Sequence, residues 1–159
     1  MTGALTGRCL CGTAQYEVVA EPLTLYACHC TDCQTSSGAS FTLILLVPPE
    51  SIEVRAGAPT PYERTRASGS RKNVFRCPDC LTPLWSARLE GGRFTTVYAG
   101  TLDGSASLRP VAHIWTRSAQ PWVEIPEGCL RFEQEADSFD SLFRAWKERE
   151  SPLEREAAV

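Results

Sequence analysis

Residues 28–33 read Cys-His-Cys-Thr-Asp-Cys, and this stretch indicates how the chain folds. Three thiols this close in sequence can gather on one metal ion at little cost in loop entropy. An extended backbone at the start of the segment directs Cys28 and Cys30 to one side and His29 to the other. Clumped cysteines converge on a metal more readily than they pair into disulfides. The segment therefore predicts a metal site with three thiolate ligands, of which Cys33 is the third.

Two further pairs of cysteines flank this segment, one in Cys9-Leu10-Cys11 and one in Cys77-Pro78-Asp79-Cys80. A structural zinc ion takes four ligands, whereas a catalytic one often takes three and keeps a position open. We therefore predict two zinc ions per chain. The structural ion is held by Cys9, Cys11, Cys77 and Cys80, and the catalytic ion by Cys28, Cys30 and Cys33. Because 65 residues separate the two outer pairs, the first ion closes a long loop and ties distant segments together.

The three-cysteine site needs a fourth ligand, which the sequence leaves open. Water, a substrate, His29 or His113 are the candidates, and a histidine would make the site a second structural one. A disulfide framework is the alternative reading of eight cysteines, but the first twelve residues carry no secretion signal. We therefore expect a cytoplasmic location, where structural disulfides are rare. Cys129 has no neighbour at ligand spacing and is predicted to be a half-buried thiol.

The composition is that of an ordinary globular domain. The chain has 159 residues, of which 43% are hydrophobic and 22% charged, and its net charge is -3. An acidic chain offers no electrostatic reason to bind nucleic acid or an anionic membrane. Its longest apolar run, residues 43–47, is too short to span a bilayer. Neither partner is expected, and nothing in the sequence indicates an oligomeric state.

Short apolar segments separated by glycine and proline predict an all-β fold, a β-sandwich or a related folded sheet rather than an α/β fold. The predicted strands are Thr13–Val18, Ser40–Val47, Ile52–Arg55, Val74–Arg76, Leu84–Ala87, Phe94–Tyr98, Ala112–Thr116 and Trp122–Ile125.

One helix is predicted from Ser138 to Arg149, because four apolar residues recur there at helical spacing. They are Phe139, Leu142, Phe143 and Trp146. Asp137 or Ser138 can cap its start, and the aromatic stripe is expected to pack on the sheet. Residues 1–132 are predicted to form the zinc-binding domain. Residues 133–159 are predicted to form a helix packed on the same domain and a frayed tail from Ser151.

The motifs together resemble the glutathione-dependent formaldehyde-activating enzyme family, which also includes centromere protein V. The resemblance runs to about Phe132 and rests on residues 7–12, 28–33 with Gly38, 77–80, 100–103, 110–114 and 122–123. It implies a fold of twisted antiparallel sheets called a β-tent, with the same division of structural and catalytic zinc ligands. Glycine is usual in the family where Arg8 and Leu81 stand here, and neither position is a ligand.

The resemblance implies a carbon–sulfur lyase whose small-molecule partner is a thiol such as glutathione. A thiol bound as fourth ligand loses its proton to the metal's charge. Its attack on formaldehyde would give a hydroxymethyl thioether, and the reverse step would cleave the carbon–sulfur bond. Three thiolates around Zn²⁺ carry a formal charge of -1, which favours thiol binding over activation of water.

Two further points concern substrate contacts and the alternative function. Arg71, Lys72 and Arg117 are candidates to pair with glutathione carboxylates, whereas Asp103 is expected to be a turn residue. The alternative is a zinc-stabilised binding or scaffold module without catalysis. Such a module would be expected to carry a basic face or extension, and this acidic chain shows neither.

Overall fold

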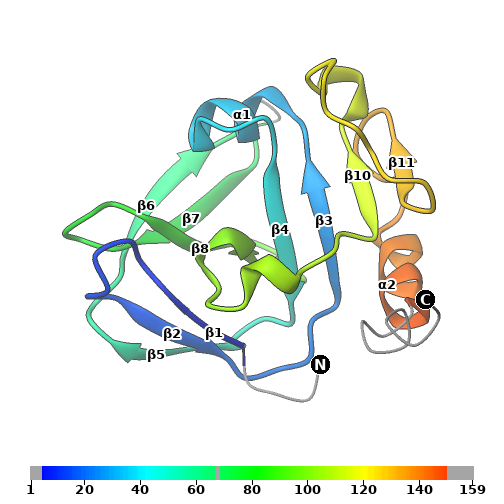
Figure 1. Ribbon diagram of the computed structural model, residues 1–159. Helices are drawn as coiled ribbons and strands as arrows, with labels where there is room; N and C mark the ends of the chain where they lie inside the picture. Colours follow the sequence, from blue (N-terminus) through cyan, green and yellow to red (C-terminus); the bar gives the residue numbers. More distant parts are fainter. Residues whose placement is uncertain (1–4, 67–68, 150–159) are drawn as a thin grey trace.

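The computed structural model describes residues 5–66 and 69–149, and it is mostly β with two sheets and a C-terminal helix (Figure 1). The smaller sheet has the strand order β1-β2-β5, with β1 at Leu5–Arg8, β2 at Gln15–Val18 and β5 at Ile52–Ala56. The larger sheet has the order β11-β10-β3-β4-β9-β8-β7-β6. Its strands are β3 (Thr24–Cys28), β4 (Thr42–Val47), β6 (Thr60–Thr65), β7 (Arg71–Arg76), β8 (Pro83–Arg88), β9 (Thr95–Tyr98), β10 (Ala112–Ile114) and β11 (Leu130–Phe132).

The larger sheet is not purely antiparallel, which corrects the sequence-based expectation. Strand β10 pairs in parallel with both β3 and β11. Parallel neighbours need a long connection that returns the chain to the same end of the sheet. The segments that precede β10 and follow it are long enough for such connections. Strands β10 and β11 have only three residues each, so their sequences contain no pattern that would reveal the direction of pairing.

One predicted strand is wrong. Residues 122–125 form no strand, and the Trp122 side chain is 71% exposed. Pro121 and Pro126 bracket the segment, and proline cannot donate a hydrogen bond to a sheet. The strand in this part of the chain is β11, which starts at Leu130.

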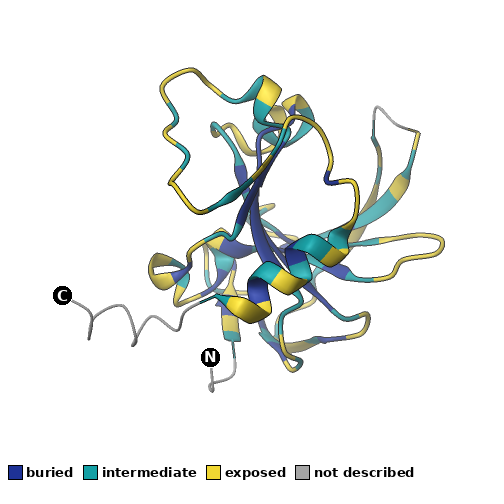
Figure 2. Cartoon of the chain, turned by 90° about the vertical axis from the view of Figure 1, so that its right-hand side faces the viewer, coloured by how far each residue is buried: buried dark blue, intermediate teal, exposed yellow. Residues whose placement is uncertain are grey.

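The core lies on both faces of the larger sheet, because β3 and β4 alternate their side chains between two apolar clusters. Leu25 and Leu45, which are partners across the two strands, belong to the cluster beneath the smaller sheet. Tyr26 and Ile44 are the next partners, and they belong to the cluster on the opposite face together with Cys28. Figure 2 shows the buried strands at the centre of the molecule.

The predicted C-terminal helix is confirmed as α2, Phe139–Glu148. The Ser138 side chain caps it by accepting a hydrogen bond from the Asp140 N–H. Leu142 and Trp146 are buried against the sheet, and the Thr24 hydroxyl donates to the Leu142 carbonyl at 3.2 Å. The tail predicted from Ser151 lies outside the described residues. None of the helices in the described part of the chain could cross a membrane.

Candidate functional site

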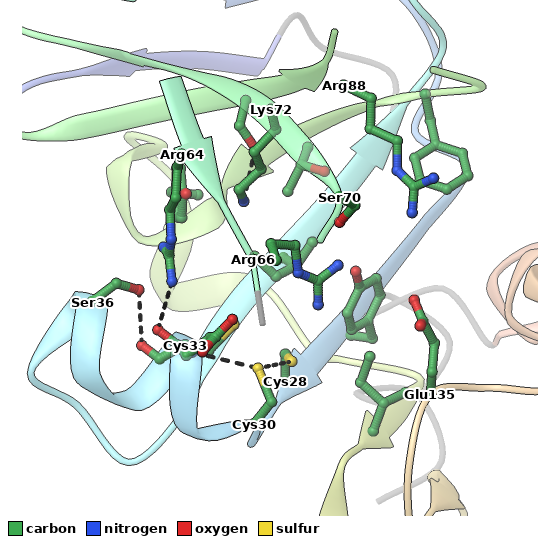
Figure 3. A pocket seen from close by; sticks show the side chains of 18 of the residues that line it. Cys28, Cys30, Cys33, Ser36, Arg64, Arg66, Ser70, Lys72, Arg88 and Glu135 are labelled. Atoms are coloured by element: carbon green, nitrogen blue, oxygen red, sulfur yellow. Dashed lines mark hydrogen bonds between the residues drawn. The ribbon is translucent and has the colours of Figure 1, made fainter. Parts of the chain in front are cut away.

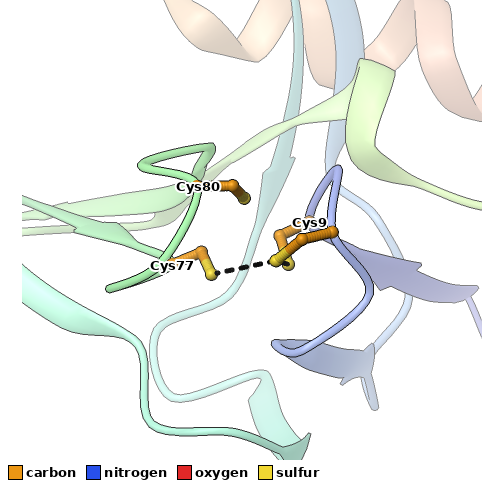
Figure 4. Close-up of side chains that lie close together, drawn as sticks. Cys9, Cys77 and Cys80 are labelled. Carbon is orange, nitrogen blue, oxygen red and sulfur yellow. Dashed lines mark hydrogen bonds between the residues drawn. The ribbon is translucent and has the colours of Figure 1, made fainter.

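Four cysteine sulfur atoms meet where the two sheets approach each other (Figure 4). Cys9 and Cys11 lie in the connection between β1 and β2, whereas Cys77 and Cys80 lie in the turn between β7 and β8. The four sulfurs are all within 4.8 Å of one another. Cys9 Sγ lies 3.4 Å from Cys11 Sγ, which in turn lies 3.7 Å from Cys77 Sγ. A metal ion held there would join the smaller sheet to the larger one.

Backbone and hydroxyl groups form hydrogen bonds with sulfurs of this cluster. The Ala14 N–H donates to Cys9 Sγ at 3.2 Å. Cys80 Sγ lies 3.0 Å from the Thr82 hydroxyl. Hydrogen bonds from the side chain and then the backbone of Thr82 lower the pKa of Cys80 to about 5. A thiolate is the form of cysteine that binds metal.

The second sulfur cluster contains Cys28, Cys30 and Cys33 and faces a cavity (Figure 3). Cys28 ends β3, and Cys30 is the extended N-cap residue of the short helix α1, Thr31–Ser37. The Cys33 N–H donates to Cys30 Sγ at 3.4 Å, and Cys28 Sγ lies 3.5 Å from Cys30 Sγ. Hydrogen bonds from the Cys28 and Cys33 thiols lower the pKa of Cys30. Helix α1, which the sequence did not predict, brings the third sulfur back toward the first two.

The two histidines are not grouped with these sulfurs among the described residues. His29 Nε2 and His113 Nδ1 form a 2.9 Å hydrogen bond with each other, and both rings are buried. Burial, followed by repulsion from His29, lowers the pKa of His113 to about 4. Of the candidates for a fourth ligand, a group that enters from the cavity therefore fits better than a histidine.

Both sulfur sets fit zinc. In tetrahedral coordination with Zn–S distances of about 2.3 Å, neighbouring sulfurs are about 3.8 Å apart, close to the separations of 3.4–3.7 Å found here. No two of the eight cysteines, all of which lie among the described residues, form a disulfide bond, so the disulfide alternative is wrong. Four sulfurs would complete a closed site, whereas the three sulfurs that line the cavity would leave one ligand to be supplied by another group.

The wall of the cavity opposite the sulfurs is basic. Arg64 on β6 is the register partner of Lys72 on β7, which is the partner of Arg88 on β8. The three residues therefore form a row across adjacent strands, and all three line the cavity together with Arg66 (Figure 3). Cations placed directly opposite one another destabilise a sheet. Such a row suits a site that receives an anion.

Hydrogen bonds fix the positions of two cationic side chains on this wall. Arg64 Nη2 donates to the Asp32 carbonyl at 3.0 Å, which places its guanidinium beside α1. Lys72 Nζ donates to the Ser86 hydroxyl at 3.3 Å. Burial, followed by repulsion from the neighbouring Arg64 and Arg66, lowers the pKa of Lys72 to about 8. Lys72 is thus cationic at neutral pH but loses its charge soon above it.

Comparison with known proteins places this arrangement in context. A family model described as glutathione-dependent formaldehyde-activating enzyme matches residues 4–118. The chain belongs to this family. A crystal structure of a Rhodobacter sphaeroides protein, a structural genomics target, is similar to the chain with 17% identity and a TM-score of 0.47. The similarity covers 62% of this chain and 88% of that one. No curated protein matches.

Arg8 and Leu81 stand where glycine is usual in the formaldehyde-activating family, and the structure shows the backbone or contacts of each. Leu81 adopts a left-handed backbone with φ of 60°, a conformation that glycine takes at no steric cost. Arg8 forms a 2.9 Å ion pair with Asp103, a turn residue as predicted, at the exposed end of β1. Neither residue contributes a sulfur to either cluster.

Of the three residues predicted to contact the substrate, the structure places one in the cavity and two elsewhere. Lys72 lines the cavity, but Arg71 points to the other face of β7 and pairs with Glu63, and Arg117 stacks on the Trp115 ring at 4.9 Å. Sequence reasoning missed Arg64 and Arg88, because only the strand register brings them together with Lys72, and it missed Arg66, which follows β6 and also lines the cavity. Cys129 is half-buried as predicted, and its thiol donates to the Pro110 carbonyl at 3.3 Å.

Two residues that line the cavity of this formaldehyde-activating family member lie beyond the part of the chain that the family model matches. Glu135 lies in the connection that follows β11, and Phe139 is the first residue of α2. Figure 3 shows Glu135 across the cavity from the arginine side chains. The C-terminal segment therefore adds a wall of its own to the site.

Proposed function

We propose that the protein is a zinc-dependent carbon–sulfur lyase that acts on the adduct of an aldehyde with a glutathione-type thiol. The observation that carries this proposal is that one cavity has a wall of cysteine sulfurs and, opposite it, a wall of cationic side chains. Three sulfurs that suit a zinc ion lie at one side, and the cation row of Arg64, Lys72 and Arg88 lies at the other. Family membership supports aldehyde chemistry with glutathione.

The charges of glutathione match the cavity. Its two carboxylates suit the cation row, since guanidinium groups bind carboxylates through paired hydrogen bonds. Its ammonium group suits Glu135, which faces that row. Zinc, when bound by Cys28, Cys30 and Cys33, supplies positive charge that keeps an incoming sulfur ligand deprotonated. The side chains of the protein then fix the direction from which an aldehyde meets that sulfur.

The reaction transfers no electrons to or from a cofactor. In the direction of addition, the thiolate sulfur forms a bond to the aldehyde carbon. The π pair of the carbonyl group moves to oxygen, which takes a proton from water. In the direction of cleavage, the hydroxyl loses its proton, the carbonyl re-forms, and the carbon–sulfur bond breaks to release the thiol.

Replacement of zinc by cobalt tests whether a thiol enters the three-cysteine site. Glutathione is expected to change the visible spectrum of the cobalt protein, because a fourth sulfur ligand alters geometry and charge-transfer bands. S-methylglutathione, which has the same charges without a free thiol, should change it far less. Cys33→Ser should abolish the response, whereas Cys129→Ser, whose thiol lies outside both clusters, should retain it. No response to millimolar glutathione would refute the role of this thiol.

A further inference from the structure

The sheet around Cys28 is apolar on the face that carries its sulfur. Tyr26 precedes Cys28 by two residues on β3 and so points to the same face. Ile44 on β4 is the register partner of Tyr26, and Ile114 on β10 is the partner of Cys28. All three line the cavity. Apart from the Tyr26 hydroxyl, the surface next to the predicted catalytic metal is therefore apolar, a property that binding of a metal or of a carboxylate does not require.

Two aromatic rings extend this surface toward solvent. Phe94 precedes β9, Phe139 begins α2, and their ring centroids are 5.0 Å apart at an angle of 55°. Phe139 also lies 6.4 Å from the Tyr26 ring. Both phenylalanines are only partly buried and both line the cavity. Helix α2 fixes Phe139 in place, because Leu142 and Trp146 on the same helix are buried.

This apolar wall bears on which aldehyde the site accepts. An adduct of formaldehyde carries only a hydroxymethyl group, which is small and polar and gains nothing from contact with aromatic rings. A larger apolar substituent gains about 25 cal/mol for each Å² that it buries. Partly exposed aromatic residues that line a cavity with a few charged groups are typical of a site for a small amphipathic ligand.

We propose that the natural substrate is the thiol adduct of an aldehyde with an apolar substituent, aromatic or aliphatic, larger than formaldehyde. This inference rests on the proposed function. The charged thiol portion lies along the cation row, and the substituent lies against Tyr26, Phe94 and Phe139. Phe139 thereby determines specificity, and it comes from the segment beyond the family match.

Thioether analogues test the substituent without requiring turnover. S-methylglutathione and S-benzylglutathione share the same charges and differ by one phenyl ring, and titration calorimetry on the zinc-loaded protein gives their Kd values. We expect the benzyl compound to bind at least about tenfold more tightly, from partial burial of its ring. Phe139→Ala should remove most of this preference while changing the Kd of the methyl compound little.

Phe143→Ala is the matched control, since it removes the same ring from the same helix at a residue that does not line the cavity. It should keep the benzyl preference. Equal or weaker binding of the benzyl compound, or an equal loss of preference in both variants, would overturn the inference and leave the proposed function standing. Failure of glutathione itself and both analogues to bind would instead refute the proposed function, and the inference with it.

Discussion

At the scale of the residue, the cation row shows how an unfavourable repulsion between side chains indicates a function. Arg64, Lys72 and Arg88 repel one another across three strands, and no carboxylate pairs with Lys72 among the ion pairs of the described residues. Burial, followed by repulsion from Arg64 and Arg66, lowers the pKa of Lys72 to about 8. The charge that would attract a carboxylate is therefore present at neutral pH and absent at moderately alkaline pH.

This pKa predicts a pH dependence of ligand binding. Lys72 is protonated below about pH 8 and neutral above it, so affinity for an anion should fall as the pH rises through 8. We expect S-methylglutathione, which has no thiol to titrate, to bind about three- to tenfold more weakly at pH 9 than at pH 7. In Lys72→Met the decrease should be much smaller, because that side chain has no charge to lose. An equal decrease in both proteins, measured by calorimetry, would contradict a role for Lys72.

At the scale of the element, helix α2 holds one wall of the cavity in place. Leu142 is fully buried at the centre of this helix. Leu142→Ala is expected to lower the free energy of unfolding by about 2–4 kcal/mol, through lost burial and the space left behind. Arg144→Ala, on the exposed side of the same helix, should change it by less than about 0.5 kcal/mol. Urea unfolding of both variants measures the difference, and a similar small effect of both would mean that α2 contributes little to the fold.

The elements also show what the sequence could predict. Apolar alternation revealed β2, a continuous apolar run revealed β4, and helical spacing revealed α2 with its Ser138 cap. Strand β6 gave no such signal, because most of its side chains are exposed and polar and it contains Pro61. Helix α1 has only seven residues, and it is defined by the Cys30 cap and the left-handed Gly38 rather than by an apolar face.

The candidate site could also be predicted from the sequence only in part. The spacing of the cysteines led to the grouping of sulfurs that the structure contains, because thiols close in sequence have few ways to converge. The cation row and the apolar wall depend on the register of strands far apart in sequence. Without the partner of β7, nothing distinguishes Lys72, which lines the cavity, from Arg71, which does not.

At the scale of the whole molecule, the two sulfur clusters occupy different positions in the architecture. The four-cysteine cluster joins the β1–β2 hairpin to the β7–β8 hairpin and so connects the two sheets. The three-cysteine cluster lies within residues 28–33, at the junction of β3 and α1. A metal in the first cluster restrains a long loop, whereas one in the second restrains almost none. A metal in the first cluster would therefore serve mainly stability, and one in the second would be free to serve chemistry.

Thermal melts of Cys77→Ser and Cys33→Ser, beside the native protein and with equal zinc, test this assignment most directly. Cys77→Ser should lower the Tm by more than about 10 °C, since about 2–4 °C is lost per kcal/mol in a chain of this size. Cys33→Ser should lower it by only a few degrees while abolishing the response to glutathione. Similar destabilisation by both substitutions would contradict the account, because it would make both ions structural.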